Sequence, residues 1–221
     1  MKLFVALCLL SGGCVCEEIV LDRRVNARHI GRTTGLDSAR PDGSVVGDDF
    51  SIGRDGETWI IDRIRTWVVA PRHHTSDPLG TPMESVEFFG GLANDQATSE
   101  CACHNLVQMK TWTSSGGSSA NPDVVVSPTS SSDLSQVEFR NLQWSVPGGA
   151  RIQFAIKVVT RGSDRQSPEE RPLLATVVLK ETHPLRIFSN DGAFKSFLNP
   201  GAANHQGTVA ISIQVWGHPV H

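Results

Sequence analysis

The densest group of residues that could do chemistry is the run Cys-Ala-Cys-His at positions 101–104. In a strand, Cys101 and Cys103 point to the same side, and two thiolates with the His104 imidazole form a ligand set that zinc or copper accepts. The histidine pair at 73–74 could supply a fourth ligand. A Cys-x-Cys pair is not the usual spacing of structural zinc sites, and exported thiols tend to oxidise. A local or intermolecular disulfide and free thiols are therefore the alternatives to a transition-metal site.

A second candidate is the carboxylate pair Asp48 and Asp49, which offers the hard oxygen ligands that calcium binds. Further carboxylates stand at Asp42 before the pair and at Asp55 and Glu57 after it. Two aspartates at the start of a strand also serve as a turn or cap that forms local hydrogen bonds. Calcium binding and a local structural role both stay open.

Four tryptophans could contact a ligand, because planar aromatic rings on an exposed sheet face or loop stack against sugar rings. Each of them also lies among Val, Ile and Leu in a strand pattern, where the indole would fill the space between two sheets. The sequence therefore offers carbohydrate binding and core packing as alternatives for Trp67, Trp112, Trp144 and Trp216.

No catalytic motif accompanies these candidates. The chain contains neither a Gly-x-Ser-x-Gly motif nor a phosphate-binding glycine loop. Serine, histidine and aspartate are too common in it for composition alone to define a triad. No catalytic residue is predicted, and a binding or structural protein is favoured over an enzyme.

The first sixteen residues predict the compartment. One lysine, an apolar run over 3–10 and several small residues precede an acidic pair, which is the pattern of a secretory signal peptide. The apolar run is far shorter than the ~20 residues of a membrane-spanning helix, and no later stretch is long enough to span either. Cleavage after Cys16 and secretion are predicted. Lipid attachment at Cys14 is the minor alternative.

Composition limits the partners and the kind of scaffold. Charged residues make up 19% of the 221 residues, the net charge is −3 and neither sign runs in blocks, so no nucleic acid or anionic membrane partner is expected. Loss of the first sixteen residues would leave Cys101 and Cys103 of the five cysteines. The chain is therefore not predicted to be a disulfide scaffold.

Alternation of apolar and polar residues predicts strands, most clearly over 151–160, 208–216 and 59–69. The third of these is apolar on both faces at its ends, and its two arginines, Arg63 and Arg65, are expected to reach outward or to stack on tryptophan. Weaker strands are predicted over 85–89, 106–113, 123–127, 136–146, 173–180 and 185–188, each bounded by Gly, Pro, Ser or Asn clusters. The apolar phase shifts within 136–146, which predicts a bulge near Asn141.

About nine short strands without a long helical pattern predict an all-β fold, an antiparallel β-sandwich of the jelly-roll or Greek-key kind. The expected organisation is a signal peptide at 1–16, an irregular segment at 17–49 that adds at most one edge strand, the sandwich at 50–217 and a tail at 218–221.

Three segments carry a resemblance to a known group: Gly47–Ile52 with the letters Asp-Asp-Phe, Thr58–Trp67 with Trp-x-Ile-x-x-Ile, and Ile211–Gly217. Together they resemble a group of largely uncharacterised secreted bacterial β-sandwich proteins, over about a quarter of the chain. The resemblance implies export and sandwich architecture. Some members end in a sorting helix with a basic tail, from which this chain departs at its last residues.

These features predict a secreted, non-catalytic β-sandwich that acts as a binding or structural module of the cell exterior, with extracellular polysaccharide as the first ligand class. One alternative is a metal-dependent extracellular hydrolase or oxidoreductase built around the cysteine and histidine cluster. Another is a self-assembling surface or matrix protein whose edge strands pair with copies of itself.

Overall fold

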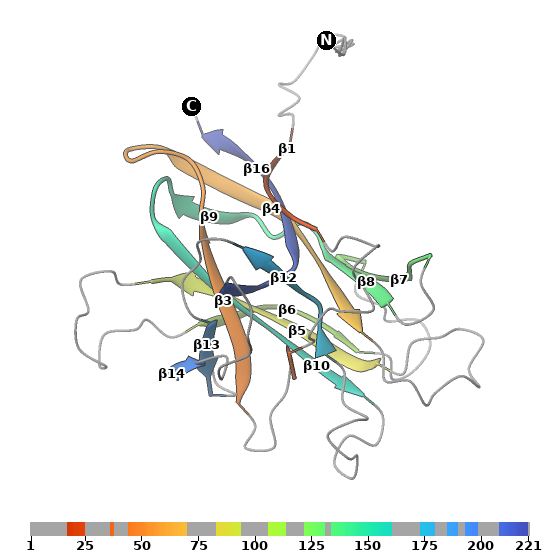
Figure 1. The fold of residues 1–221 in the computed structure, drawn as a ribbon. Helices are drawn as coiled ribbons and strands as arrows, with labels where there is room; N and C mark the ends of the chain where they lie inside the picture. Colours follow the sequence, from red (N-terminus) through yellow and green to blue (C-terminus); the bar gives the residue numbers. More distant parts are fainter. Residues whose placement is uncertain are drawn as a thin grey trace, which may run out of the picture.

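The computed structural model describes residues 17–24, 36–37, 44–69, 83–93, 106–113, 122–130, 134–160, 173–179, 185–189, 193–198 and 208–220. All regular structure in these ranges is β-strand, and the paired strands are antiparallel, which confirms the predicted fold class (Figure 1). The same ranges contain no helix long and apolar enough to cross a membrane. The expected signal peptide lies outside the described residues.

The larger sheet has eight strands and is built around the twelve-residue strand β4. Strand β16 and then β11 pair with one edge of β4, and β8 and β9 pair with the other edge. Strand β1 extends this sheet beyond β16, β2 extends it beyond β11, and β7 extends it beyond β8. The bounds are β1 (Glu18–Arg23), β2 (Leu36–Asp37), β4 (Thr58–Val69), β7 (Val124–Pro128), β8 (Leu134–Phe139), β9 (Trp144–Pro147), β11 (Leu173–Leu174) and β16 (Ile213–Val220).

The second sheet has six strands in the order β14-β13-β3-β10-β5-β6. A separate two-stranded sheet pairs β12 with β15. The bounds are β3 (Val45–Ser51), β5 (Met83–Leu92), β6 (Val107–Thr113), β10 (Arg151–Thr160), β12 (Thr176–Leu179), β13 (Leu185–Phe188), β14 (Phe194–Leu198) and β15 (Thr208–Ile211).

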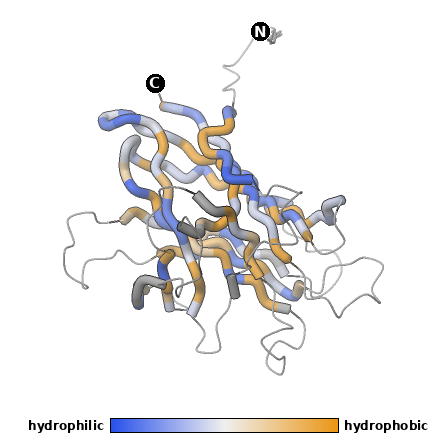
Figure 2. Tube along the Cα trace, viewed as in Figure 1, coloured by the Kyte–Doolittle hydropathy of each residue, from blue (hydrophilic) through white to orange (hydrophobic). Residues whose placement is uncertain are grey.

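The eight-stranded and six-stranded sheets pack face to face around one hydrophobic cluster. Ile61 and Ile64 of β4 and Phe154 and Ile156 of β10 belong to this cluster and are fully buried. Hydrophobic and hydrophilic residues alternate along the strands in Figure 2, so each sheet turns one apolar face inward. Burial of each such side chain contributes about 1.5–3 kcal/mol. The outer faces stay available for polar groups.

The expected number of strands was too low, since the described residues form sixteen strands rather than about nine. Two of the strands predicted from the sequence are each divided into two, at the residue where the chain passes between the eight-stranded and the two-stranded sheet. Ala175 separates β11 from β12, and Ser212 separates β15 from β16, where the Ser212 amide donates to the Ala175 carbonyl at 2.9 Å. Apolar periodicity continues through both points, which is why the sequence does not reveal the divisions.

The chain between β8 and β9 confirms the predicted bulge near Asn141. Phe139 lies opposite Ile64 and Trp144 lies opposite Ile61, so four residues of this chain face two of β4. Asn141 adopts a φ of 50°, a left-handed conformation that asparagine tolerates better than most residues.

Strands continue past the segment boundaries expected from the sequence. The segment expected to be irregular, 17–49, holds the edge strand β1, the short strand β2 and most of β3. Strand β16 runs on to Val220, past the expected end of the sandwich at 217. Residues 218–220, which were expected to form a tail, therefore belong to the eight-stranded sheet, where they pair with β4.

Candidate functional site

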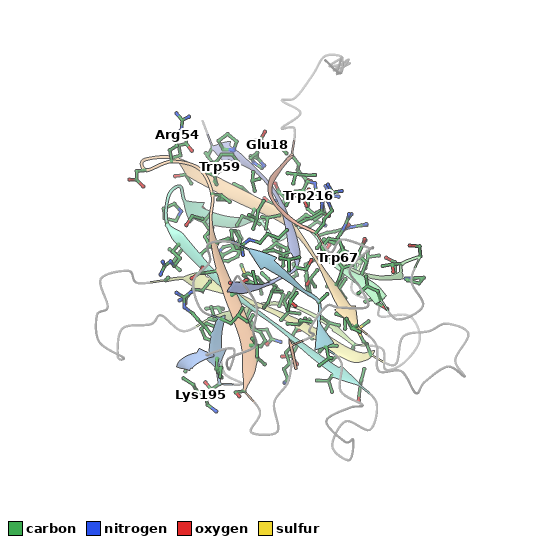
Figure 3. All side chains as sticks on the ribbon, in the orientation of Figure 1. Glu18, Arg54, Trp59, Trp67, Lys195 and Trp216 are labelled. Carbon is green, nitrogen blue, oxygen red and sulfur yellow. The ribbon has the colours of Figure 1, made fainter. Side chains whose placement is uncertain are left out.

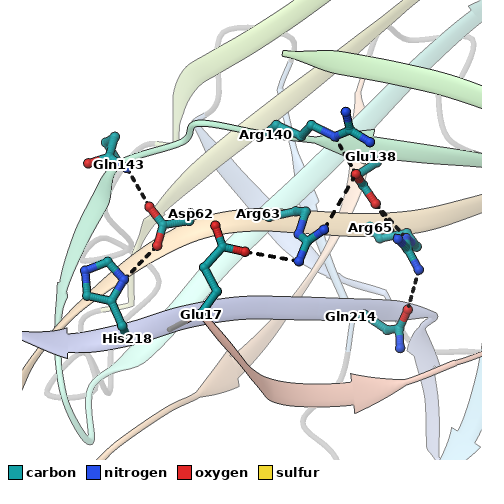
Figure 4. A network of polar contacts seen from close by, with 9 residues as sticks. All are labelled: Glu17, Asp62, Arg63, Arg65, Glu138, Arg140, Gln143, Gln214 and His218. Carbon is teal, nitrogen blue, oxygen red and sulfur yellow. Dashed lines mark hydrogen bonds and ion pairs between the residues drawn. The ribbon is translucent and has the colours of Figure 1, made fainter. Parts of the chain in front are cut away.

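A network of charged and polar side chains lies on the outer face of the eight-stranded sheet (Figure 4). Its position follows from a bulge in β4: Arg63 lies opposite Trp216, but Ile61 lies opposite Gly217, so Asp62 is an extra residue. Because the bulge shifts the alternation, Ile61 and Ile64 both point into the core. Arg63, Arg65 and Trp67 of β4 consequently face outward.

Glu138 of β8 is the centre of this network. Its side chain is only 2% exposed, and it lies opposite Arg65 of β4. Arg65 donates to its carboxylate from Nε at 2.9 Å and Nη2 at 2.5 Å, and Arg140 donates from Nε at 2.5 Å. Arg63 Nη1 lies 4.0 Å from the same carboxylate. Burial raises the pKa of Glu138, but the hydrogen bonds from Arg65 and Arg140 outweigh this, so the pKa lies below its ordinary value.

Trp216 of β16 holds two of these arginines in place. The guanidinium carbons of Arg63 and Arg65 lie 4.2 Å and 4.8 Å from its ring centroid. Stacking of this kind contributes about 0.5–2 kcal/mol per pair. The expected outward or tryptophan-stacked placement of the two arginines is therefore confirmed.

The outer arginine, Arg140, keeps free hydrogen-bonding groups. It follows β8 directly, and its side chain is 47% exposed. Within the part of the chain that the structure describes, its Nε is engaged by Glu138 and its two terminal nitrogens have no hydrogen-bond partner. Arg65, by contrast, also donates from Nη1 to Gln214 at 3.3 Å, and Arg63 donates from Nη2 to Glu17 at 3.0 Å.

A histidine–carboxylate pair lies beside the arginines. Asp62, at the bulge, accepts a hydrogen bond from Gln143 Nε2 at 2.5 Å. Its second oxygen lies 2.8 Å from Nδ1 of His218, although the two atoms are not aligned as a hydrogen bond. The side chain of Asp62 is buried, whereas that of His218 is partly exposed. This carboxylate is directed to His218 and Gln143, away from the arginine cluster (Figure 4).

The sequence-predicted tryptophans do not share one environment. Trp67 and Trp216 lie on the outer face of the eight-stranded sheet, but they are only 8% and 7% exposed (Figure 3). Trp67 packs with Leu134 and Ala175. Trp144 packs against the main core, with its ring edge-on to Phe88 at 6.1 Å. Trp112 lies in β6, and its side chain is outside the described residues.

The predicted calcium ligands, Asp48 and Asp49, lie on opposite sides of β3. Asp48 accepts hydrogen bonds from the backbone amides of Asp49 and Ile211, at 2.7 and 2.8 Å, and from Arg23 at 3.3 Å. Asp49 is paired with Arg186. Successive residues of a strand face opposite ways, so the two aspartates do not converge on one ion.

The other predicted metal ligands, Cys101, Cys103 and His104, lie outside the described residues, and a metal site there stays a prediction. In the ranges that the structure does describe, no three His, Cys, Asp or Glu side chains are grouped so as to hold a metal ion.

Sequence reasoning missed Glu138, Arg140, Asp62 and His218. A signal for the first two was the alternation of Gln136, Glu138 and Arg140, which leaves one polar face on β8. No comparable signal exists for His218, which was assigned to a short tail.

The three segments that carry the family resemblance are strands of the two main sheets and of the two-stranded sheet. Thr58–Trp67 belongs to β4, which pairs with β16 at the end of Ile211–Gly217, and Gly47–Ile52 includes most of β3. The resemblance itself stays a prediction. Comparison of the chain with protein-family models, with curated proteins and with solved structures finds no match.

Proposed function

We propose that this protein is a secreted, non-catalytic binding module and that its outer arginine face binds carbohydrate. The arginine face comprises Arg63, Arg65, Arg140, Glu138 and Trp216. One observation carries the proposal: partly exposed guanidinium groups are held in fixed orientations by a buried carboxylate and an indole ring. A preordered array of this kind loses little side-chain entropy when it binds a ligand.

The side chains of this face suit the hydroxyl groups of sugars. Guanidinium groups present several donors in a planar fork, and the neighbouring exposed residue Gln143 adds an amide group. Because Trp216 is covered by Arg63 and Arg65, a sugar would contact the guanidinium planes above the indole and not the indole itself. The ligand class is thus the one expected from the tryptophans, but the contacting groups differ.

Electrostatics favour binding over proton-transfer catalysis at this face. A general acid or base works best with a pKa near the working pH. The pKa of Glu138 is instead lowered by Arg65 and Arg140, so this carboxylate stays ionised and holds the arginines. Its role in the proposal is to fix the guanidinium groups in position.

Affinity electrophoresis of the purified chain through gels that contain neutral or acidic polysaccharides tests the proposal. We expect at least one polysaccharide to retard the chain, and Arg63→Gln to weaken that retardation at least tenfold. Arg54→Gln is the matched control, since Arg54 lies at the β3–β4 turn, away from Trp216 (Figure 3). Migration unaffected by every polysaccharide would refute carbohydrate binding.

Self-assembly is a second candidate, supported by the edge of the six-stranded sheet. β6 is the last strand of that sheet, and its first residue, Val107, is 67% exposed. An edge strand with an exposed apolar residue can pair with another chain. Sedimentation over a hundredfold range of concentration tests this, and Val107→Lys is expected to abolish any association. A monomer at all concentrations would exclude it.

A further inference from the structure

We infer that the arginine face recognises an acidic polysaccharide, and that Arg140 binds its anionic group, a carboxylate or a sulfate. This inference rests on the proposed function and names the ligand class of the same face. Three observations support it: the arginine face has more positive than negative charge, its positive groups are the exposed ones, and Arg140 has hydrogen-bond donors without a partner among the described residues.

The balance of charge at this face favours an added anion. Three guanidinium groups surround the single carboxylate of Glu138, at distances between 2.5 and 4.0 Å. Glu17 compensates Arg63. Arg65 and Arg140 then share the one negative charge of Glu138. The carboxylate of Asp62 does not contribute, because it faces His218 and Gln143.

The positive groups are also the accessible ones. Glu138 is almost fully buried beneath the arginines, whereas Arg63 and Arg65 are about a quarter exposed and Arg140 is about half exposed. A ligand that approaches from solvent therefore meets guanidinium groups first. Since a charge near solvent is only partly screened over a few ångströms, a bound anion would interact with all three.

Arg140 has the donors that such an anion needs. Its Nη1 and Nη2 have no hydrogen-bond partner among the described residues, while its Nε is fixed on Glu138 at 2.5 Å. Two parallel N–H groups match two oxygens of a carboxylate or sulfate. The backbone amide of Arg140 donates to the Asp123 carbonyl at 2.6 Å, and the Asp123 carboxylate is engaged by Lys110 at 2.7 Å. The fork is thus held at its base and open at its end.

The surroundings favour a saccharide over a nucleic acid. The chain carries a net charge of −3, so its long-range field attracts neither a nucleic acid nor an acidic polysaccharide. Binding must instead rely on local contacts, and the exposed residues Gln143 and Ser145 bring amide and hydroxyl groups to the segment that follows Arg140. A chain of sugars with spaced anionic groups fits this mixture of one cationic fork and neutral donors.

The test compares two forms of one polymer. Isothermal titration of the purified chain with polygalacturonate and with its fully methyl-esterified form isolates the carboxylate, because the sugar backbone is the same. We expect esterification to weaken binding at least tenfold and added salt to weaken only the acidic form. A sulfated galactan and neutral agarose form the second pair, which identifies sulfate as the recognised group if only the sulfated polymer binds.

Variants of Arg140 assign the role to this side chain. Arg140→Gln should reduce affinity for the acidic polymer at least tenfold, and Arg54→Gln, which removes the same charge elsewhere, should not. Arg140→Lys can keep an ion pair with Glu138 but lacks the two-donor fork. If Arg140 has only a structural role, this variant should bind fully; if Arg140 binds the anionic group, its affinity should fall several-fold. Unfolding curves confirm that each variant is folded.

The outcomes separate the two proposals. Equal affinity for the charged and the neutral polymer of every pair that binds would overturn the inference and leave carbohydrate binding in place. Preference for the acidic polymer without any effect of Arg140→Gln would overturn the assignment of Arg140. Absence of binding to all four polymers would overturn carbohydrate binding itself.

Discussion

Glu138 and Asp48 are both almost completely buried, yet their pKa values shift in opposite directions. The carboxylate of Glu138 lies on the outer face of the eight-stranded sheet under three arginines, and its pKa is lowered. Asp48 lies in β3 on the side of the core residues Val46 and Phe50, and its pKa is raised to about 6. The surroundings of a buried carboxylate therefore decide the direction in which its pKa shifts.

The number and closeness of cations explain the difference. Around Asp48, burial is the largest influence and raises the pKa. Arg23, at 3.3 Å, and the backbone amides of Asp49 and Ile211 lower it again, but only in part. Glu138 receives closer hydrogen bonds from two guanidinium groups that also keep contact with solvent. A carboxylate with surplus cations stays ionised in mildly acidic solution, whereas one with too few becomes protonated there.

The two carboxylates therefore make the stability of the fold depend on pH in opposite ways. Asp48 has a higher pKa in the folded chain than its ordinary 3.8, so its contribution is present below about pH 4 and is lost as the pH rises to about 6. Glu138 has a lower pKa in the folded chain than its ordinary 4.5, so its contribution is present above that pH and is lost as the pH falls.

The largest expected effect is the pH dependence that Asp48 produces. The free energy of unfolding of the wild-type chain, relative to that of Asp48→Asn, should fall by about 2.5 kcal/mol between pH 4 and pH 7, since the pKa rises from 3.8 to about 6 on folding and each pKa unit corresponds to about 1.4 kcal/mol. Urea unfolding at several pH values measures both chains. The difference in the free energy of unfolding between the two chains removes the contribution of all groups that titrate alike in both.

A second variant sharpens this measurement. Arg23→Gln removes the cation that lowers the pKa of Asp48, so it should destabilise the fold more at pH 7 than at pH 4. A difference between wild type and Asp48→Asn that stays flat over this range would show that Asp48 is as well compensated as Glu138, and the comparison would fail.

The next effect concerns the surplus of cations around Glu138. Glu138→Gln leaves three arginines without their shared counter-ion, and we expect a loss of about 2 kcal/mol of stability at pH 7. This is below the range of about 3–5 kcal/mol for broken buried pairs, because the arginines are partly exposed. Unfolding in urea measures the loss. Glu84→Gln makes the same change at an exposed position of β5 and should have little effect. Equal losses in both variants would contradict a central role for Glu138.

Sequence periodicity was sufficient for the parts of this fold that depend on local alternation. The predicted strand over 151–160 is β10, and the predicted strand over 59–69 is β4. The outward placement of Arg63 and Arg65 also followed, because two charged residues inside an apolar strand have only the outer face to occupy.

The site depends on strand register, which periodicity does not contain. Arg65 meets Glu138 only because β8 pairs with β4 in one register, and His218 meets Asp62 only because β4 bulges at that residue. A shift of either pairing by one residue would send these side chains to the opposite face. The polar face of β8 could be predicted from its sequence, but its partner 73 positions earlier could not.

The smallest expected effect tests whether Trp216 contributes through its arginines. Trp216→Leu and Trp67→Leu remove the same ring from two equally buried positions on the outer face of one sheet, but only Trp216 stacks on guanidinium groups in the described structure. Trp216→Leu should therefore cost about 1 kcal/mol more, from two cation–π contacts of about 0.5 kcal/mol each at a partly exposed site. Urea unfolding of both variants at pH 7 gives this difference. If the two losses are equal, the indole serves the arginine face by packing alone, and Glu138 would be left as the group that fixes the guanidinium planes.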